Sequence, residues 1–395
     1  MRVLWATSLL PDPTFGGGPS IEHEHLRWAS RHHEVTLVTG GLRPGDPVPP
    51  ALAELSLVEV VAAGAADLAP LGRVGTFGRS LSGPPLELLV AQPRVQRIAA
   101  ELEHRSADLV HVAWAESAPV AVQAARRFPT AFFACDSFTR HAERQLGEAR
   151  SVRQRVYWRL QRARTRAWER GYCAAGEVAV VSPVDAAALG ELGVRAMVVP
   201  SALGDEWFEP SVVGREPELV TFIGALDYGP NVEAVGWLLH EVWPRIRAVR
   251  TGARLRVIGR HPVPSLAAAV AVTAGAELLA DVPEVRSHYG AAAAVLLPIR
   301  LGSGVRTKVL HAFACRAPVV ATARAVEGLD VRDGDQVLLA DDAAGLAAAT
   351  LRTLDDPRAA AARADRAAEI AAAHRTERVI SSLEALWHRA ATSGS

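Results

Sequence analysis

Residues 293–314 read AAVLLPIRLGSGVRTKVLHAFA. The apolar run Ala293 to Leu297 precedes a Gly-Ser-Gly loop, and apolar residues then recur at helical spacing. A buried strand, a glycine loop and a helix in this order are typical of a parallel α/β sheet. The start of such a helix binds anions through free backbone N–H groups and the helix dipole. The stretch therefore predicts an anion site with Arg306 and Lys308 as its cations. The alternative is that both are solvated surface charges, but their place at the carboxyl end of a strand favours the binding interpretation.

Short apolar runs alternate with helix-length segments along the rest of the chain, which predicts two doubly wound parallel sheets of the Rossmann type. The irregular segment after Pro200 indicates a linker. We expect a first domain over 1–205, a second over 206–375, and a last helix, 376–395, that docks back on the first domain. The cleft between the two domains is the expected ligand site. The predicted strands are 2–6, 34–38, 57–61, 109–113, 130–134, 178–181 and 196–199, then 219–224, 254–259, 276–280, 293–297, 319–321 and 336–340.

Composition excludes several classes of protein. The chain has 395 residues, enough for two domains, and its 43 Lys plus Arg balance 43 Asp plus Glu, which argues against a nucleic-acid partner. Its three cysteines are too few and too scattered for a disulfide framework or a zinc site, which favours the cytoplasm. No segment is long and apolar enough to span a membrane, which leaves peripheral contact open. The histidines match no metal-ligand spacing, and no nucleophile motif for covalent catalysis is present.

Polar residues in the first half of the chain lie where strands are predicted to end. Gly17 and Gly18 open a helix after the first strand, where a diphosphate could approach; a plain turn is the alternative. His111 falls inside a strand, so packing or a backbone hydrogen bond is its expected role. The candidates for acceptor contact and proton transfer are Glu116, Asp136, Ser137 and His141, with Asp136 best placed to touch substrate.

Two further features have open interpretations. His311 lies three residues after Lys308 on one helix, so it is either a ligand contact or a structural histidine. The segment 152–170 predicts a helix with a basic stripe beside an apolar one. A solvated helix face is the ordinary meaning of this stripe, and contact with anionic lipid or a phosphorylated acceptor is the alternative. The basic stripe consists of Arg155, Arg159, Arg162, Arg166 and Arg170, and the apolar stripe of Val152, Val156, Leu160, Ala163 and Ala167.

Several motifs follow one another in a fixed order. They are Gly17-Gly18, Glu34–Val38, Val180–Ser182 with Asp185, Phe222–Tyr228 with Pro230-Asn231, Val257–Arg260, Gly302–Ala314, Pro318–Thr322 and Glu327–Leu329. In this order and spacing they resemble glycosyltransferase family 4. The resemblance covers nearly the whole chain, is specific from Leu219 to Leu329, and is loose between Leu42 and Ala107. It implies a GT-B fold, with an acceptor-binding first domain and a nucleotide-sugar-binding second domain.

The resemblance also assigns roles to residues. It implies that Arg306 and Lys308 neutralise the donor diphosphate, and that no cofactor or metal is needed beyond a donor of the UDP or GDP type. Together with Asp136, the strand-end residue best placed to touch substrate, they form the predicted catalytic set. Two family glutamates are replaced here by Ser303 and His311, and Ala113 stands where many members have histidine. The residues implied in donor binding are Gly17, Gly18, Gly224, Asn231, Arg260, Gly302, Ser303, Gly304 and His311.

The predicted activity is transfer of a hexose-type sugar, with retention at the anomeric carbon, to a hydroxyl, amine or thiol of a small molecule or glycan. Positive charge beside the departing diphosphate would stabilise the transition state more than the ground state. One alternative is a GT-B relative that binds nucleotide sugar as a partner subunit without transfer. Another is a sugar-nucleotide epimerase on the same fold.

Overall fold

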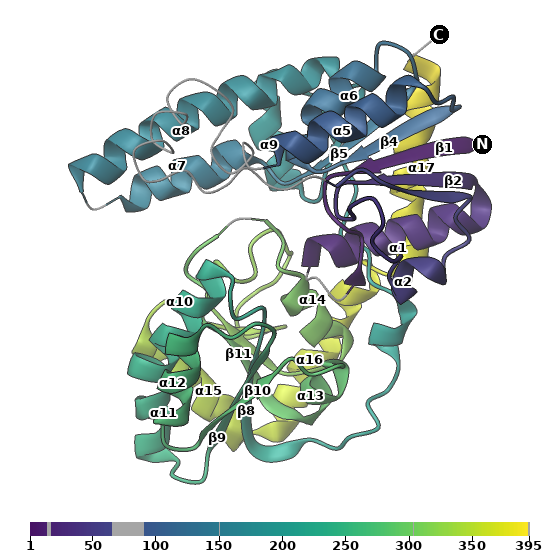
Figure 1. Cartoon of the computed structure of the whole chain (residues 1–395). Helices are drawn as coiled ribbons and strands as arrows, with labels where there is room; N and C mark the ends of the chain where they lie inside the picture. Colours follow the sequence, from purple (N-terminus) through teal and green to yellow (C-terminus); the bar gives the residue numbers. More distant parts are fainter. Residues whose placement is uncertain (14–16, 65–90, 150, 303, 394–395) are drawn as a thin grey trace. The chain divides into compact units, whose positions relative to one another are not determined.

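The computed structural model describes the whole chain except residues 14–16, 65–90, 150, 303 and 394–395. The described residues form two compact units (Figure 1). Unit 1 consists of Met1–Ala202 and Thr376–Ser395, and unit 2 consists of Leu203–Arg375. Unit 2 therefore begins at Leu203, slightly before residue 206, where the sequence predicts the second domain to start. Leu203 belongs to unit 2 because its backbone N–H donates to the His374 carbonyl of that unit at 2.8 Å.

The sheet of unit 1 has seven parallel strands among the described residues, in the order β3-β2-β1-β4-β5-β6-β7. Each lies within one or two residues of a predicted apolar run, so the prediction of this sheet is confirmed. Apolar runs reveal such strands because both faces of a parallel sheet are covered by helices. The strands are β1 (Arg2–Thr7), β2 (Glu34–Thr39), β3 (Glu59–Ala62), β4 (Leu109–Ala113), β5 (Thr130–Cys135), β6 (Glu177–Val180) and β7 (Ala196–Val198).

The helices of unit 1 connect these strands and cover the sheet. Among the described residues of both units, no helix combines the length and the apolar composition that crossing a bilayer requires. The helices of unit 1 are α1 (Gly17–His32), α2 (Pro50–Ala53), α5 (Gln92–Glu103), α6 (Ala118–Ala124), α7 (Phe138–Glu148), α8 (Val152–Arg170), α9 (Pro183–Gly190) and α17 (Thr376–Ser393).

Unit 2 has six parallel strands among its described residues, in the order β10-β9-β8-β11-β12-β13. All six correspond to predicted strands. The last is shorter than predicted because it is an edge strand that pairs only with the three-residue β12. The strands are β8 (Glu216–Ile223), β9 (Arg254–Gly259), β10 (Ala276–Ala280), β11 (Ala292–Leu297), β12 (Val319–Ala321) and β13 (Leu338–Leu339).

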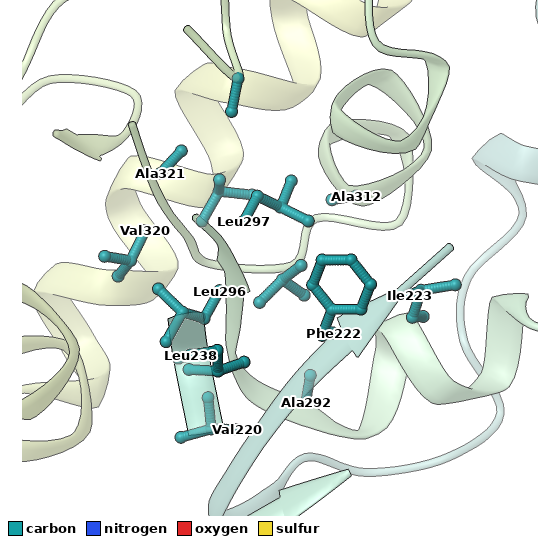
Figure 2. Close-up of a cluster of buried hydrophobic side chains, with 14 of the residues drawn as sticks. Val220, Phe222, Ile223, Leu238, Ala292, Leu296, Leu297, Ala312, Val320 and Ala321 are labelled. Carbon is teal, nitrogen blue, oxygen red and sulfur yellow. The ribbon is translucent and has the colours of Figure 1, made fainter. Parts of the chain in front are cut away.

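The helices of unit 2 pack on both faces of its sheet. Figure 2 shows side chains of β8, β11 and β12 gathered in one cluster, including Phe222, Leu296 and Val320, each fully buried. Burial of such side chains contributes about 1.5–3 kcal/mol each. The helices are α10 (Gly229–Trp237), α11 (Trp243–Val249), α12 (Pro264–Ala271), α13 (Arg286–Ala291), α14 (Thr307–Ala314), α15 (Ala343–Asp355) and α16 (Pro357–Ala372).

Both sheets contain a point where the strand order reverses, which we call the switch point. In unit 1 it lies between β1 and β4, and in unit 2 between β8 and β11. Doubly wound sheets bind their ligands at such points, because the loops at the carboxyl ends of the two strands diverge there. The chemistry-bearing residues of this chain should therefore follow these four strands.

The C-terminal helix α17 packs within unit 1, against α1 and strands β4, β5 and β6. Its Trp387 is buried, and the indole Nε1 donates to Nδ1 of His111 in β4 at 3.1 Å. The His111 ring also lies 4.0 Å from the Trp5 ring, measured between centroids. His111 therefore has the packing role predicted for it.

Candidate functional site

The loop after β11 takes its shape from two glycines. Gly302 and Gly304 have φ values of 92° and 80°, in the left-handed region that glycine adopts without strain. Ser303, the third predicted donor contact here, lies outside the described residues. The loop opens α14, whose first turn carries Lys308. Backbone donors of a helix start and a lysine thus meet at the switch point of unit 2.

Lys308 is held in place by Asn231, which lies in the first turn of α10 after β8. The Lys308 ammonium donates to Oδ1 of Asn231, and Nδ2 of Asn231 donates to the Ala225 carbonyl at 2.8 Å. The ammonium also lies 5.1 Å from the centroid of the Phe222 ring. The loops after β8 and β11 therefore position one cation between them.

The charge of Lys308 is sensitive to its surroundings. Burial, followed by the nearby Arg306 guanidinium, lowers the pKa of Lys308 to about 7. An anion bound beside the ammonium would favour its protonated form and raise this pKa. Lys308 is therefore suited to binding an anionic ligand, because the negative charge of the ligand would stabilise the buried ammonium.

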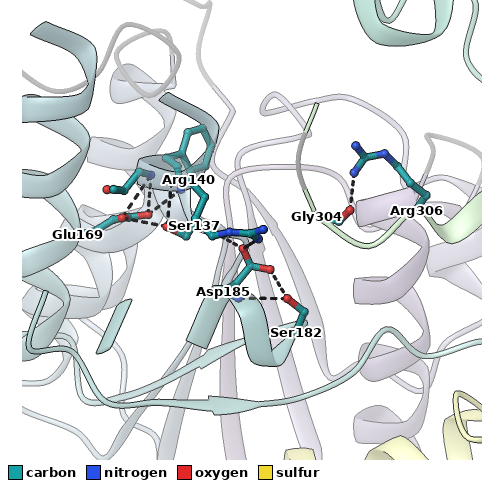
Figure 3. A network of polar contacts seen from close by, with 9 residues as sticks. Ser137, Arg140, Glu169, Ser182, Asp185, Gly304 and Arg306 are labelled. Atoms are coloured by element: carbon teal, nitrogen blue, oxygen red, sulfur yellow. Dashed lines mark hydrogen bonds and ion pairs between the residues drawn. The ribbon is translucent and has the colours of Figure 1, made fainter. Parts of the chain in front are cut away.

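The Arg306 side chain turns back onto its own loop (Figure 3). Its Nη1 donates to the Gly304 carbonyl and its Nη2 to the Leu301 carbonyl, the latter at 3.3 Å. The guanidinium therefore braces the glycine loop and adds positive charge to it.

Two more glycines leave room for this arrangement. A Cβ on Gly224 would lie 2.5 Å from Nζ of Lys308, and a Cβ on Gly259 would lie 1.8 Å from the Gly224 carbonyl oxygen. Arg260 follows Gly259, and its carbonyl accepts from the Leu226 backbone N–H at 2.8 Å. The predicted donor residues Gly224 and Asn231 thus come together with Lys308, and Arg260 is joined to the loop after β8 through its backbone.

His311 stacks on an aromatic ring from the segment that begins unit 2. Its ring lies 3.6 Å from the Trp207 ring with an interplanar angle of 5°. Burial, followed by the charge of Lys308, lowers the pKa of His311 to about 3, so the imidazole is neutral. Trp207 was not singled out in the sequence, because it lies outside every strand and helix pattern.

In unit 1 a buried carboxylate lies beneath the switch point. Glu22 of α1 accepts hydrogen bonds from Trp5 Nε1 at 2.9 Å, Thr7 Oγ1 at 3.1 Å and Trp114 Nε1 at 2.6 Å. Burial raises the pKa of Glu22 to about 7, although the three hydrogen bonds oppose the rise. Sequence analysis missed Glu22, since one glutamate in a helix carries no signal of its partners.

Glu116, a predicted acceptor contact, lies in the same neighbourhood after β4. Its Oε1 accepts from Ser8 Oγ, just beyond β1, at 2.7 Å, and burial raises the pKa of the carboxyl. A Cβ on Gly18 would lie 2.5 Å from the Trp114 ring, and Gly17 begins α1 beside it. The structure therefore brings Gly17, Gly18 and Glu116 to the switch point of unit 1.

The predicted residues after β5 have different environments. Ser137 is buried at the N-cap of α7, and its hydroxyl donates to Glu169 at 3.2 Å (Figure 3). Its backbone N–H donates to Asp185 at 3.3 Å, so its polar groups are engaged in the fold. Asp136 is half-buried, and the His141 ring lies edge-on to Trp158 at 5.7 Å. Of this group, Asp136 and His141 are the ones with exposed surface.

The variant Glu22→Gln should change how the free energy of unfolding depends on pH. The folded carboxyl keeps its proton up to about pH 7 and the unfolded one only to about 4.5, so its contribution to stability falls as pH rises between these values. The variant cannot titrate, so wild type should lose about 3 kcal/mol relative to it across this range. Urea unfolding of both proteins at both ends of the range measures this difference. An identical pH dependence in the two proteins would contradict it.

The described residues contain no group of three or more His, Cys, Asp or Glu side chains arranged to hold a metal ion.

Two family models match the sequence. The model described as glycosyl transferase 4-like domain matches residues 15–202, and the model described as glycosyl transferases group 1 matches residues 217–356. Together they cover most of the chain and follow the division into units 1 and 2. A comparison with curated protein sequences finds no significant match.

Solved structures resemble the chain over its whole length. Sucrose-phosphate synthase from Thermosynechococcus elongatus matches with a TM-score of 0.71 at 17% identity, covering 98% of each chain. Alr3699/HepE from Anabaena, in complex with UDP, matches with a TM-score of 0.64 at 13% identity, covering 98% of this chain and 99% of that one. A glycosyltransferase from Rickettsia africae matches with a TM-score of 0.64 at 11% identity, covering 98% of each chain. These likenesses show that the predicted GT-B fold is correct.

Proposed function

We propose that the chain is a retaining family 4 glycosyltransferase of the GT-B fold, because a glycosyl transferase 4-like model and a glycosyl transferases group 1 model match successive parts of it. It transfers a hexose-type sugar from a nucleoside diphosphate sugar to a hydroxyl, amine or thiol of a small molecule or glycan. The observation that carries this proposal is the Lys308 ammonium, held by Asn231 at the start of α14 beside the glycine loop.

The leaving group explains why a cation is needed there. Breaking the bond from the anomeric carbon to the phosphate oxygen leaves a nucleoside diphosphate with additional negative charge. A fixed ammonium, backbone N–H groups and the Arg306 charge stabilise this anion more than the intact donor. The transfer therefore needs no resident metal in our proposal. UDP is the first donor nucleotide to test because Alr3699/HepE binds it, and GDP is the second.

The acceptor is assigned to unit 1. Glu116, Asp136 and His141 contact the acceptor from the carboxyl ends of β4 and β5. Asp136 belongs to the catalytic set because it is half-buried at a strand end. The acceptor proton passes to a donor phosphate oxygen as the new glycosidic bond forms. Ser137 contributes through its N-cap, which holds α7 behind these residues.

The variant Gly224→Ala tests whether the position of the Lys308 ammonium beside Asn231 matters for nucleotide binding. The new methyl would meet Nζ of Lys308 at 2.5 Å and Nδ2 of Asn231 at 3.0 Å, so the ammonium must move while the backbone stays in place. We expect roughly a tenfold rise in the dissociation constant of the nucleotide, which corresponds to about 1.4 kcal/mol. Calorimetric titration measures this change. Unchanged affinity would mean that the nucleotide does not use Lys308.

A transfer assay tests the function itself. The purified chain is incubated with UDP- and GDP-sugars, with and without a panel of glycan and small-molecule acceptors, and the nucleoside diphosphate released is measured. Release that depends on an acceptor, with retained anomeric configuration in the product, supports the proposal. Nucleotide binding without any release would refute it.

The second candidate is a partner subunit that binds nucleotide sugar without transferring it. His311 favours it, because a neutral imidazole stacked on Trp207 occupies the position of a glutamate in the family. Binding without release, in the assay above, is the outcome that this candidate predicts.

A further inference from the structure

Helix α8 has an inverted distribution of polar and apolar residues. Its buried side chains are Gln161, Thr165 and Glu169, whereas Val152 is 71% exposed and Val156 is 48% exposed. Ala163 and Ala167, on the same side of the helix, are exposed as well. A surface helix normally turns its apolar stripe to the core. Here the predicted apolar stripe faces outward, apart from the half-buried Leu160.

The exposed apolar stripe lies among arginines. α8 carries seven arginines, and its one acidic residue, Glu169, is buried at the N-terminus of α7. Among the described residues, the Arg155, Arg159 and Arg162 side chains form no ion pair or hydrogen bond, and all three are exposed. The chain as a whole is neutral, so this concentration of charge is local.

Within unit 1, α7 and α8 run side by side as a pair that extends away from the sheet (Figure 1). Glu169 anchors this pair at its base, because it accepts from the Phe138 backbone N–H at 2.6 Å and from Ser137 Oγ at 3.2 Å. The outer face of α8 is therefore presented on a supported helix and not on a loose segment.

We propose that this face of α8 docks on a membrane surface that contains anionic lipids. The valines and alanines enter the headgroup region while the flanking arginines bind lipid phosphates, each contributing about 1 kcal/mol. A second copy of the chain is disfavoured as the occupant, since two such faces would repel each other. The proposal goes beyond the transfer reaction and does not depend on it.

Vesicle binding tests this proposal. The full chain is mixed with vesicles of phosphatidylcholine alone or of phosphatidylcholine with phosphatidylglycerol, and the bound fraction is measured by co-sedimentation. We expect binding only to the anionic vesicles, weakened by added salt. The triple variant Arg155→Gln, Arg159→Gln, Arg162→Gln should lose affinity on the order of 100-fold. Val152→Ser with Val156→Ser should also weaken binding while leaving the charge unchanged.

The matched control removes the same charge elsewhere in unit 1. Arg126, Arg195 and Arg378 are exposed, and their combined change to glutamine should leave vesicle binding near the wild-type level. Equal loss in the control, or no binding of wild type to anionic vesicles, would overturn the proposal. So would a wild-type dimer that the α8 variant dissociates in sedimentation analysis, or binding to RNA without binding to vesicles. Thermal unfolding of every variant verifies its fold.

Discussion

Lys308→Ala lowers kcat/KM for sugar transfer by about 100- to 1,000-fold, the range seen when one preorganised donor to a developing anion is removed. The reason is that the Lys308 ammonium, from the segment after β11, is fixed in place by its hydrogen bond to Asn231, from the segment after β8. The fold should persist, because the change removes a buried charge, which burial disfavours. Steady-state kinetics with the donor identified in the release assay measures the effect.

Arg254→Ala is the matched control for Lys308→Ala. Arg254 begins β9, at the opposite end of the strands from the glycine loop, and forms an exposed ion pair with Glu216 at 2.9 Å. Exposed pairs contribute less than about 1 kcal/mol, so transfer by this variant should stay close to the wild-type rate. Normal turnover by Lys308→Ala would show that the diphosphate site lies elsewhere.

Trp387→Ala should lower the free energy of unfolding of unit 1 by about 4 kcal/mol, a typical cost of deleting a buried tryptophan. The indole lies within 6.2 Å of the Trp5 ring and 6.1 Å of the Trp28 ring, and it donates to His111. Removing it leaves a cavity between α17, α1 and the sheet and deprives His111 of its donor. Chemical denaturation measures the loss.

Two further variants separate packing from hydrogen bonding at this position. Trp387→Phe keeps most of the ring but not the donor, so it should cost about 1–2 kcal/mol. The neighbouring His388 is exposed, and His388→Ala should have little effect. A wild-type stability for Trp387→Ala would mean that α17 does not help to hold unit 1 together.

The strands could be predicted from the sequence because a parallel strand is buried on both faces and therefore forms a short, continuous apolar run. The glycines, helix start and two cations over 302–308 are likewise adjacent in the chain, so their proximity could be predicted from the sequence, and their role as an anion site stays a prediction. These features are local. What they do not reveal is which distant side chain each residue meets.

Long-range contacts explain what sequence analysis missed. Glu22 matters because Trp5, Thr7 and Trp114 converge on it from two strands, and nothing near Glu22 in sequence indicates this. Trp207 is likewise visible only through its stacking on His311. The outward apolar stripe of α8 was hidden because periodicity identifies a stripe without showing which stripe the neighbouring helix covers.

In the proposed reaction, Lys308 and the glycine loop bind the departing diphosphate. The most direct test is a crystal structure of the chain with the nucleoside diphosphate released in the transfer assay. We predict a phosphate oxygen within hydrogen-bonding distance of Lys308 Nζ and of backbone N–H groups at the start of α14. A nucleotide bound away from this corner of unit 2, with Lys308 still engaged only by Asn231, would contradict the claim.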